Sequence, residues 1–159
     1  DAATYNGEGT SEFMRLDAVF KRIPIRGCTF KNTGSFPVFK RGFGILAYGA
    51  SFILEPTCNI IEFPSGECAG TKNRFEGLTY GVAEKAWNAM PPVAVKRCEF
   101  IDNFRSVLMT NQYGAVITKN IFNMPGSGFI PGARPWRRAR STTYSLMSNV
   151  APANFWTSA

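Results

Sequence analysis

Apolar and polar residues alternate along three segments of this chain, and each segment ends at a phenylalanine. The segments are Ile23–Phe30, Val93–Phe100 and Ala115–Phe122. Each has apolar residues seven and five positions before the Phe, and Cys or Asn two positions before it. A shorter copy, Asn73–Phe75, also has Asn two positions before the Phe. Such alternation predicts strands with one buried face.

The same pattern recurs along the chain at a nearly constant interval. Phe100 follows Phe75 by 25 residues and precedes Phe122 by 22. After the Phe comes a turn residue, and then a second short strand begins with a small residue. These second strands are Gly44–Ala47, Gly81–Glu84 and Ser106–Met109. Strand, corner, strand and return make one coil of a solenoid, so we expect an all-β parallel β-helix of about five rungs of 22–25 residues.

Stacked coils place like residues on like, since neighbouring parallel strands lie about 4.8 Å apart. We therefore expect two internal columns, one aromatic and one aliphatic. Their members are Phe30, Phe75, Phe100 and Phe122 for the first, and Ile25, Val95 and Ile117 for the second. Parallel crossovers are overwhelmingly right-handed, which predicts a right-handed coil.

The pattern has two interruptions. We expect rungs over residues 1–124, a long loop excursion over residues 50–72, and an irregular basic tail or cap over residues 125–159. Within the tail, Ser145–Asn149 echoes Val107–Asn111, so the tail is alternatively a truncated further rung. An uncapped β-helix exposes unpaired strand edges, and we therefore expect either a cover here or more rungs in the native chain.

The composition indicates the class of protein but no particular activity. The 159 residues with 45% hydrophobic content suit one domain, and no apolar run reaches the roughly 18 residues of a membrane span. The net charge of +7 is concentrated in the segment from Arg134 to Arg140. This segment is either a solvated basic loop or a polyanion-binding patch. No motif of a nucleic-acid-binding fold accompanies it, and we expect no nucleic-acid partner.

The four cysteines divide by position. Cys28 and Cys98 share one inward column with a coil between them, about 9.6 Å apart, which exceeds the Cα separation of about 7 Å that a disulfide allows. They are predicted to be buried free thiols. Cys58 and Cys68 bracket a short polar loop within the excursion, where we expect a disulfide and hence an oxidising compartment. No CxxC and no His are present, so we expect no metal and no cofactor.

Catalysis on a β-helix usually needs carboxylates clustered on an outward face. In the regular rungs Glu76 follows its Phe whereas Glu99 precedes its own, so the two fall in different columns. We therefore expect no catalytic residue and no enzyme. Aromatic residues offer a binding role instead: Phe43 and Tyr80 precede the small residue of their strands, and Arg105 holds the same place one rung on.

An outward column of Phe43, Tyr80 and Arg105 could stack against sugar rings, and Trp87 and Tyr113 in the following connections could extend it. The alternative is that long loops cover these aromatics and that the column is only packing.

The rung pattern Val-x-Val-x-x-Cys-x-Phe-x-x-Asn, followed by a small residue and Val or Ile, resembles the right-handed parallel β-helix repeat of the pectate-lyase-like superfamily. The segment Arg74–Val82 with the Cys98 rung is similar to large Bacteroidetes surface proteins exported by the type IX secretion system. The resemblance covers roughly residues 12–124. It implies a secreted or cell-surface location, and a role as a non-catalytic rigid spacer, adhesion or glycan-contact module.

Two other functions stay open at this point. The chain is alternatively a fragment of a polysaccharide lyase or glycoside hydrolase whose catalytic residues lie elsewhere. It is otherwise a small component bound to a larger secretion or surface assembly. Partners would accordingly be surface polysaccharide or that assembly.

Overall fold

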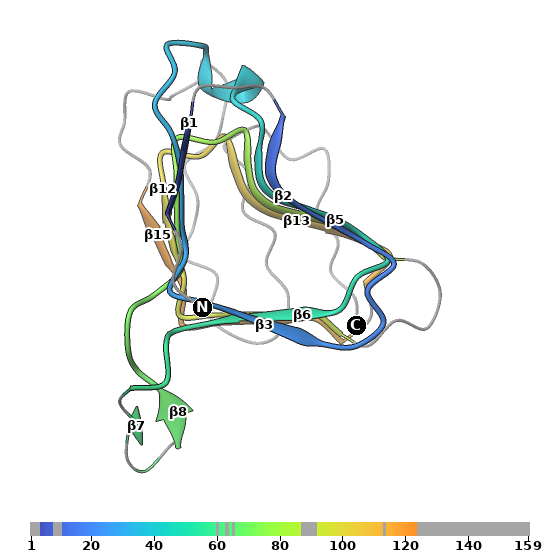
Figure 1. The fold of residues 1–159 in the computed structure, drawn as a ribbon, viewed down its shortest axis with the longest axis vertical. Helices are drawn as coiled ribbons and strands as arrows, with labels where there is room; N and C mark the ends of the chain where they lie inside the picture. The colour runs from blue at the N-terminus through green and yellow to red at the C-terminus, as the bar shows by residue number, and fades with distance from the viewer. Residues whose placement is uncertain are drawn as a thin grey trace, which may run out of the picture.

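The computed structural model describes residues 4–7, 11–59, 61–62, 64, 66–86, 92–112 and 114–123. These residues form an all-β structure in which three parallel sheets enclose a triangular core (Figure 1). The predicted tail over residues 125–159, including the basic segment Arg134 to Arg140 and the echo Ser145–Asn149, lies outside the described residues.

The three sheets take their strands in the order in which the chain reaches them. Sheet A contains β1 (Thr4–Gly7), β4 (Thr29–Asn32), β9 (Arg74–Glu76), β12 (Glu99–Ile101) and β15 (Ile121–Asn123). Sheet B contains β2 (Glu12–Asp17), β5 (Phe43–Tyr48), β10 (Tyr80–Lys85) and β13 (Arg105–Thr110). Sheet C contains β3 (Ile23–Arg26), β6 (Phe52–Glu55), β11 (Ala94–Lys96) and β14 (Val116–Thr118).

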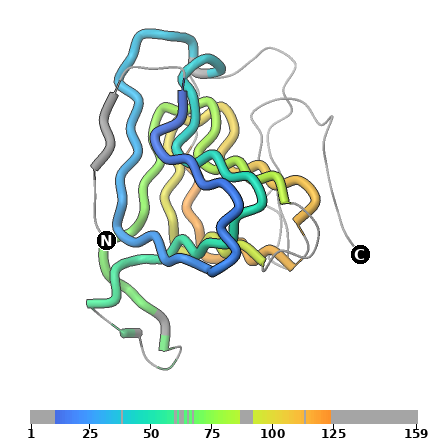
Figure 2. The backbone as a smooth tube through the Cα atoms, turned by 45° about the vertical axis from the view of Figure 1, so that its right-hand side comes forward, coloured from blue at the N-terminus to red at the C-terminus, as the bar shows by residue number. Residues whose placement is uncertain are grey.

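The chain passes from sheet B to sheet C to sheet A and then repeats, so that its turns lie side by side (Figure 2). This winding is consistent with a parallel β-helix solenoid. Two short elements depart from it: a 3₁₀ helix, η1 (Val38–Lys40), and an antiparallel pair, β7 (Ile61–Glu62) with β8 (Glu67–Cys68). Both project from corners of the triangle in Figure 1.

The aromatic column predicted from the sequence is present in sheet A. Phe30, Phe75, Phe100 and Phe122 stack in that order, with ring centroids 4.9, 5.0 and 5.1 Å apart. The first three are buried, and Phe122 on the last described strand is half-buried. In-register parallel pairing explains the order, because β9 sets Phe75 opposite both Phe30 and Phe100.

The excursion predicted for residues 50–72 begins later than expected. Its first part is β6, which pairs with β3 and β11 and places Leu54 between Ile25 and Val95 in the aliphatic column. Phe52 and Leu54 are fully buried, so this segment carries the same alternation as the others. An alignment anchored on phenylalanine misses it because the loop inserted after β6 separates Leu54 from Phe75.

Asparagine side chains close the corner between sheets C and A. Asn73 Oδ1 accepts from the backbone N–H of Cys28 at 2.9 Å, and Asn73 Nδ2 donates to the carbonyls of Ile25 (2.9 Å) and Glu55 (3.0 Å). Asn120 repeats this two coils further on, accepting from the Cys98 N–H at 2.8 Å. Buried backbone groups at the corner thereby keep partners that no neighbouring strand supplies.

None of the described residues forms a helix that is long and apolar enough to cross a membrane.

Candidate functional site: an aromatic surface at one corner

Phe43, Tyr80 and Arg105 lie in one outward column across β5, β10 and β13, because the register sets Tyr80 opposite both of the others. The rings of Phe43 and Tyr80 stack at 4.9 Å with 6° between their planes. The Arg105 guanidinium lies 5.5 Å from the Tyr80 ring centroid, and its Nη1 donates to the Tyr80 hydroxyl at 3.1 Å. All three side chains are half-buried.

This column does not offer the sugar platform that the sequence suggested. Phe43 covers one face of the Tyr80 ring and Arg105 covers the other, because β10 lies between β5 and β13. When aromatic residues stack in a column across neighbouring coils, each ring packs its faces against the residues above and below it. Neither face of the Tyr80 ring is therefore available to a sugar.

An open pocket of about 290 Å³ borders the edge of this column. It is lined by Phe39, Lys40, Gly42, Phe43, Thr79 and Tyr80. Phe39 is 50% exposed and meets Phe104 edge-on at 6.2 Å. Lys40 Nζ lies 6.0 Å from the Phe39 ring centroid, so the pocket combines apolar surface with a cation.

Two hydrogen bonds to the Thr79 side chain hold one side of this pocket in place. The Thr79 hydroxyl oxygen accepts from the backbone N–H groups of Arg41 at 2.7 Å and Gly42 at 3.1 Å. These bonds fasten the segment after η1 to the start of β10. The pocket wall that carries Phe39 is therefore tied to the rigid coil.

Sequence reasoning found Phe43, Tyr80 and Arg105 but missed Phe39 and Lys40. Both follow the corner after β4, in a connection without rung periodicity. The available signal was the aromatic-rich run Phe36–Lys40, which puts large apolar residues in a loop. The other two expected site residues, Trp87 and Tyr113, lie outside the described residues.

The carboxylates that would serve catalysis on sheet A are held in ion pairs. Glu76 bonds Lys31 at 2.9 Å and Arg74 at 2.9 Å, and Glu99 bonds Lys72 at 3.2 Å. Burial alone would raise the pKa of Glu76, but its bonds to Lys31 and Arg74 outweigh burial and lower it. The register sets Glu99 opposite Arg74, so Glu76 and Glu99 occupy different columns, as predicted.

Glu84 is a buried carboxyl that the sequence analysis assigned only to a rung strand. It is 2% exposed in the inward face of β10, between Ala47 and Met109. Its Oε1 accepts a long hydrogen bond of 3.4 Å from the Ala50 N–H, and burial raises its pKa to about 7. With no route to the outer surface, this group has no access to a polymer substrate.

Cys58 and Cys68 are joined by a disulfide with their Cα atoms 4.6 Å apart. Glu55 lies close enough to both sulfurs for a three-ligand cluster within 4.8 Å. The bonded sulfurs are not thiolates, and Arg26 Nε donates to the Glu55 carboxylate at 2.8 Å, so this state offers poor metal ligands.

Cys28 and Cys98 are buried and take part in no disulfide, as predicted, and burial raises the pKa of Cys98.

No protein-family profile, curated protein or solved structure matches this chain.

Proposed function

We propose that this chain is a non-catalytic segment of a secreted or cell-surface protein, a right-handed parallel β-helix of about five rungs that contacts surface glycans. The observation that carries the proposal is the pocket beside the Phe43–Tyr80 column, where half-exposed Phe39 meets Lys40 on a rigid corner. An apolar ring with adjacent cations and hydroxyls matches a sugar, which has one apolar face and a polar rim.

In this arrangement the sugar lies in the pocket rather than on the column. Its apolar face packs against Phe39 and the edges of Phe43 and Tyr80. Its hydroxyls reach the Tyr80 hydroxyl and the Lys40 ammonium. Rigidity favours this use, because the coil orders the contact residues before any ligand arrives.

The non-catalytic part of the proposal is supported by the engaged carboxylates. Lys31 and Arg74 bind Glu76, and Lys72 binds Glu99, so neither carboxylate is without a cation. A fragment of a polysaccharide-degrading enzyme, with its catalytic residues outside the described residues, is the main alternative. A rigid spacer, or a component of a larger surface assembly, would need no glycan at all.

Phe39→Ala tests the site directly. It should weaken binding to a surface polysaccharide roughly three- to tenfold, because aromatic contacts contribute about 0.5–1.5 kcal/mol beyond area burial. Tyr80→Phe keeps the column and removes only the hydroxyl, so a smaller loss is expected. Isothermal titration calorimetry provides the affinities. Phe20→Ala is the matched control, since Phe20 is 69% exposed and does not line the pocket.

Two results would contradict the proposal. Equal affinity in Phe39→Ala and Phe20→Ala would remove the pocket from the binding site. Turnover of a polymer substrate that is lost in Glu76→Gln or Glu99→Gln would make the chain an enzyme. A chelator should leave binding unchanged, because no step of this contact uses a metal.

A further inference from the structure

The turn of the coil between β2 and β5 combines exposed phenylalanines with an excess of positive charge. The described part of the chain exposes three phenylalanines strongly, and all three lie here: Phe20 (69%), Phe39 (50%) and Phe36 (46%). Residues 18–43 contain no acidic residue and six basic ones: Lys21, Arg22, Arg26, Lys31, Lys40 and Arg41. The following residues, 44–104, contain seven acidic and five basic ones. This turn therefore differs from its neighbours in both charge and exposed apolar surface.

Two of the exposed phenylalanines belong to copies of one short motif, Phe-Lys-Arg. The copies are Phe20–Arg22 and Phe39–Arg41. The first lies between β2 and β3, where the chain passes from sheet B to sheet C, and the second lies at the end of η1, just before β5 of sheet B. These two corners are at opposite ends of sheet B in Figure 1. A flat surface that approaches the outer face of sheet B therefore meets both motifs.

The charges of the two motifs are not neutralised by carboxylates. Arg26 and Lys31 of the same turn form ion pairs with the next coil. The four cations of the motifs take part in no ion pair within the described ranges. Arg22 and Arg41 donate to backbone carbonyl oxygens, which are neutral acceptors and leave the charge in place. Both corners therefore present a positive field to the solvent.

The outer face of sheet B continues the apolar surface between the two corners. The register places Ala83 of β10 between Leu46 of β5 and Leu108 of β13. None of these three side chains belongs to the core cluster. Arg15 binds both acidic residues of β2, so their negative charge on this face is compensated. The face offers apolar contact and little repulsion to an anionic surface.

We propose that this face binds an anionic lipid surface through the two Phe-Lys-Arg corners. The phenylalanine rings enter the boundary between headgroups and acyl chains, and the cations beside them bind the lipid phosphates. Phe20 does not line the pocket beside Phe43, so nothing encloses a sugar there. An apolar layer, by contrast, accepts an exposed ring without a pocket. This inference does not depend on glycan binding, although Phe39 takes part in both contacts.

Co-sedimentation with lipid vesicles tests the proposal. Vesicles of equal parts phosphatidylcholine and phosphatidylglycerol should bind the protein at least about tenfold more tightly than vesicles of phosphatidylcholine alone. Phe20→Ala should weaken binding to the anionic vesicles about three- to tenfold, because one ring no longer enters the acyl boundary. Lys21→Gln combined with Lys40→Gln should weaken it about tenfold or more, since each basic residue near an anionic surface contributes about fivefold in affinity.

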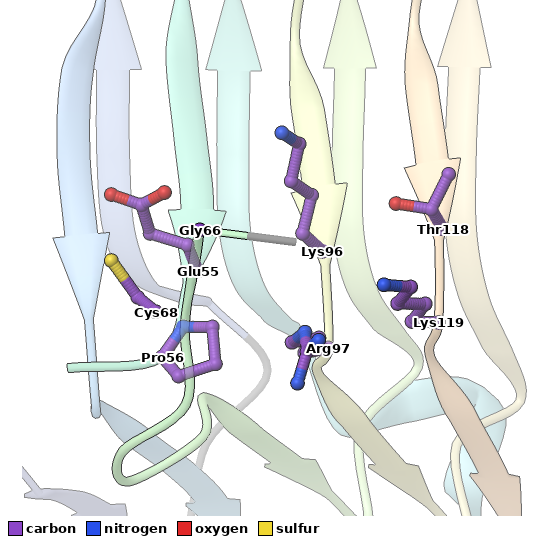
Figure 3. A pocket seen from close by; sticks show the side chains of 8 residues that line it. All are labelled: Glu55, Pro56, Gly66, Cys68, Lys96, Arg97, Thr118 and Lys119. Atoms are coloured by element: carbon purple, nitrogen blue, oxygen red, sulfur yellow. The ribbon is translucent and has the colours of Figure 1, made fainter. Parts of the chain in front are cut away.

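Two variants away from sheet B are the matched controls. Ile61→Ala removes an apolar side chain that is 58% exposed on the loop after β6. Lys96→Gln combined with Lys119→Gln removes the same charge as the first double variant. Figure 3 shows these two lysines with Glu55 around a pocket of about 160 Å³, at the corner between sheets C and A. Both control proteins should bind the anionic vesicles nearly as tightly as the wild type.

Three results would overturn this assignment: equal binding to the two kinds of vesicle, equal binding by Phe20→Ala and Ile61→Ala, or equal binding by the two double lysine variants. Dextran sulfate tests a soluble polyanion as the partner. An affinity for dextran sulfate that matches the affinity for vesicles, and that Phe20→Ala leaves unchanged, would also exclude the lipid surface. Loss of vesicle binding in Phe20→Ala with unchanged affinity for glycan is the expected pattern, and it separates this surface from the glycan pocket.

Discussion

Many residues of this protein are held in place by contacts with residues of the neighbouring coils. The Asn73 side chain forms hydrogen bonds with three backbone groups from two coils. The Tyr80 ring packs between Phe43 and Arg105. Glu84 is the exception, because its neighbours Ala47 and Met109 offer its carboxyl no charge or donor. Its Oε2 has no hydrogen-bond partner among the described residues.

Glu84→Gln should therefore remove a pH dependence of stability. Burial raises the folded-state pKa to about 7 from 4.5, so the folded protein binds more protons between these values. The contribution of Glu84 to stability should then be largest below about pH 4.5, fall as the pH rises to about 7, and level off above it. At pH 8 the variant should gain up to about 3 kcal/mol in the free energy of unfolding, and at pH 4 little.

Urea unfolding at the two pH values measures this difference. Asp17→Asn is the control, because Asp17 is exposed on β2. A wild-type protein that is as stable at pH 8 as at pH 4, with Glu84→Gln unchanged from it, would show that the carboxyl reaches water.

At the scale of elements, several strands have only three residues, and hydrogen bonds at the corners between sheets add to those within the strands. β9, β11, β12, β14 and β15 each have three residues. Such strands form few ladder bonds, and the asparagine at the corner between sheets C and A adds side-chain bonds between coils. Asn73 is fully buried whereas Asn120, in the same column, is half-buried.

Asn73→Ala should lower the free energy of unfolding by about 3 kcal/mol or more, because it leaves the Cys28 N–H and the carbonyls of Ile25 and Glu55 buried without this partner. Asn120→Ala removes hydrogen bonds to the Cys98 N–H and the Val95 carbonyl at a half-buried site and should cost about half as much. Chemical denaturation of both variants measures the ratio. Equal losses at the two positions would mean that burial of the corner does not set the cost.

At the scale of the whole molecule, one aromatic column runs through sheet A and ties successive coils into a single core. Phe100 lies in its middle, between Phe75 and Phe122, and is 1% exposed. Removing it opens a void that rigid strands on both sides cannot close.

Phe100→Ala should cost about 3–5 kcal/mol, the usual range for a large buried aromatic. Thermal and urea unfolding provide the measurement, and Phe20→Ala, at a 69% exposed position, should change stability little. A mild loss in Phe100→Ala would imply that the coils are not packed as one unit.

Much of this arrangement could be predicted because the sequence pattern that produces it repeats along the chain. Alternation before each Phe identifies strands, and the pattern that these strands share puts Phe30, Phe75, Phe100 and Phe122 in one column. β6 was missed because an insertion breaks the interval between Leu54 and the next Phe, although Phe52 and Leu54 alternate normally. The pocket at Phe39 lies in a connection, where contacts depend on how the loop folds back and no spacing predicts it.

The loop between β6 and β9 leaves the coil and returns to it at nearly the same point. The Thr57 N–H donates to the Thr71 carbonyl at 2.9 Å, and the Gly70 N–H donates to the Thr57 carbonyl at 2.9 Å. The two ends of the loop are therefore held close together, and the length of the segment between them has little effect on the coil. We therefore expect this corner to accept inserted segments of other lengths while the strands of the coil keep their places.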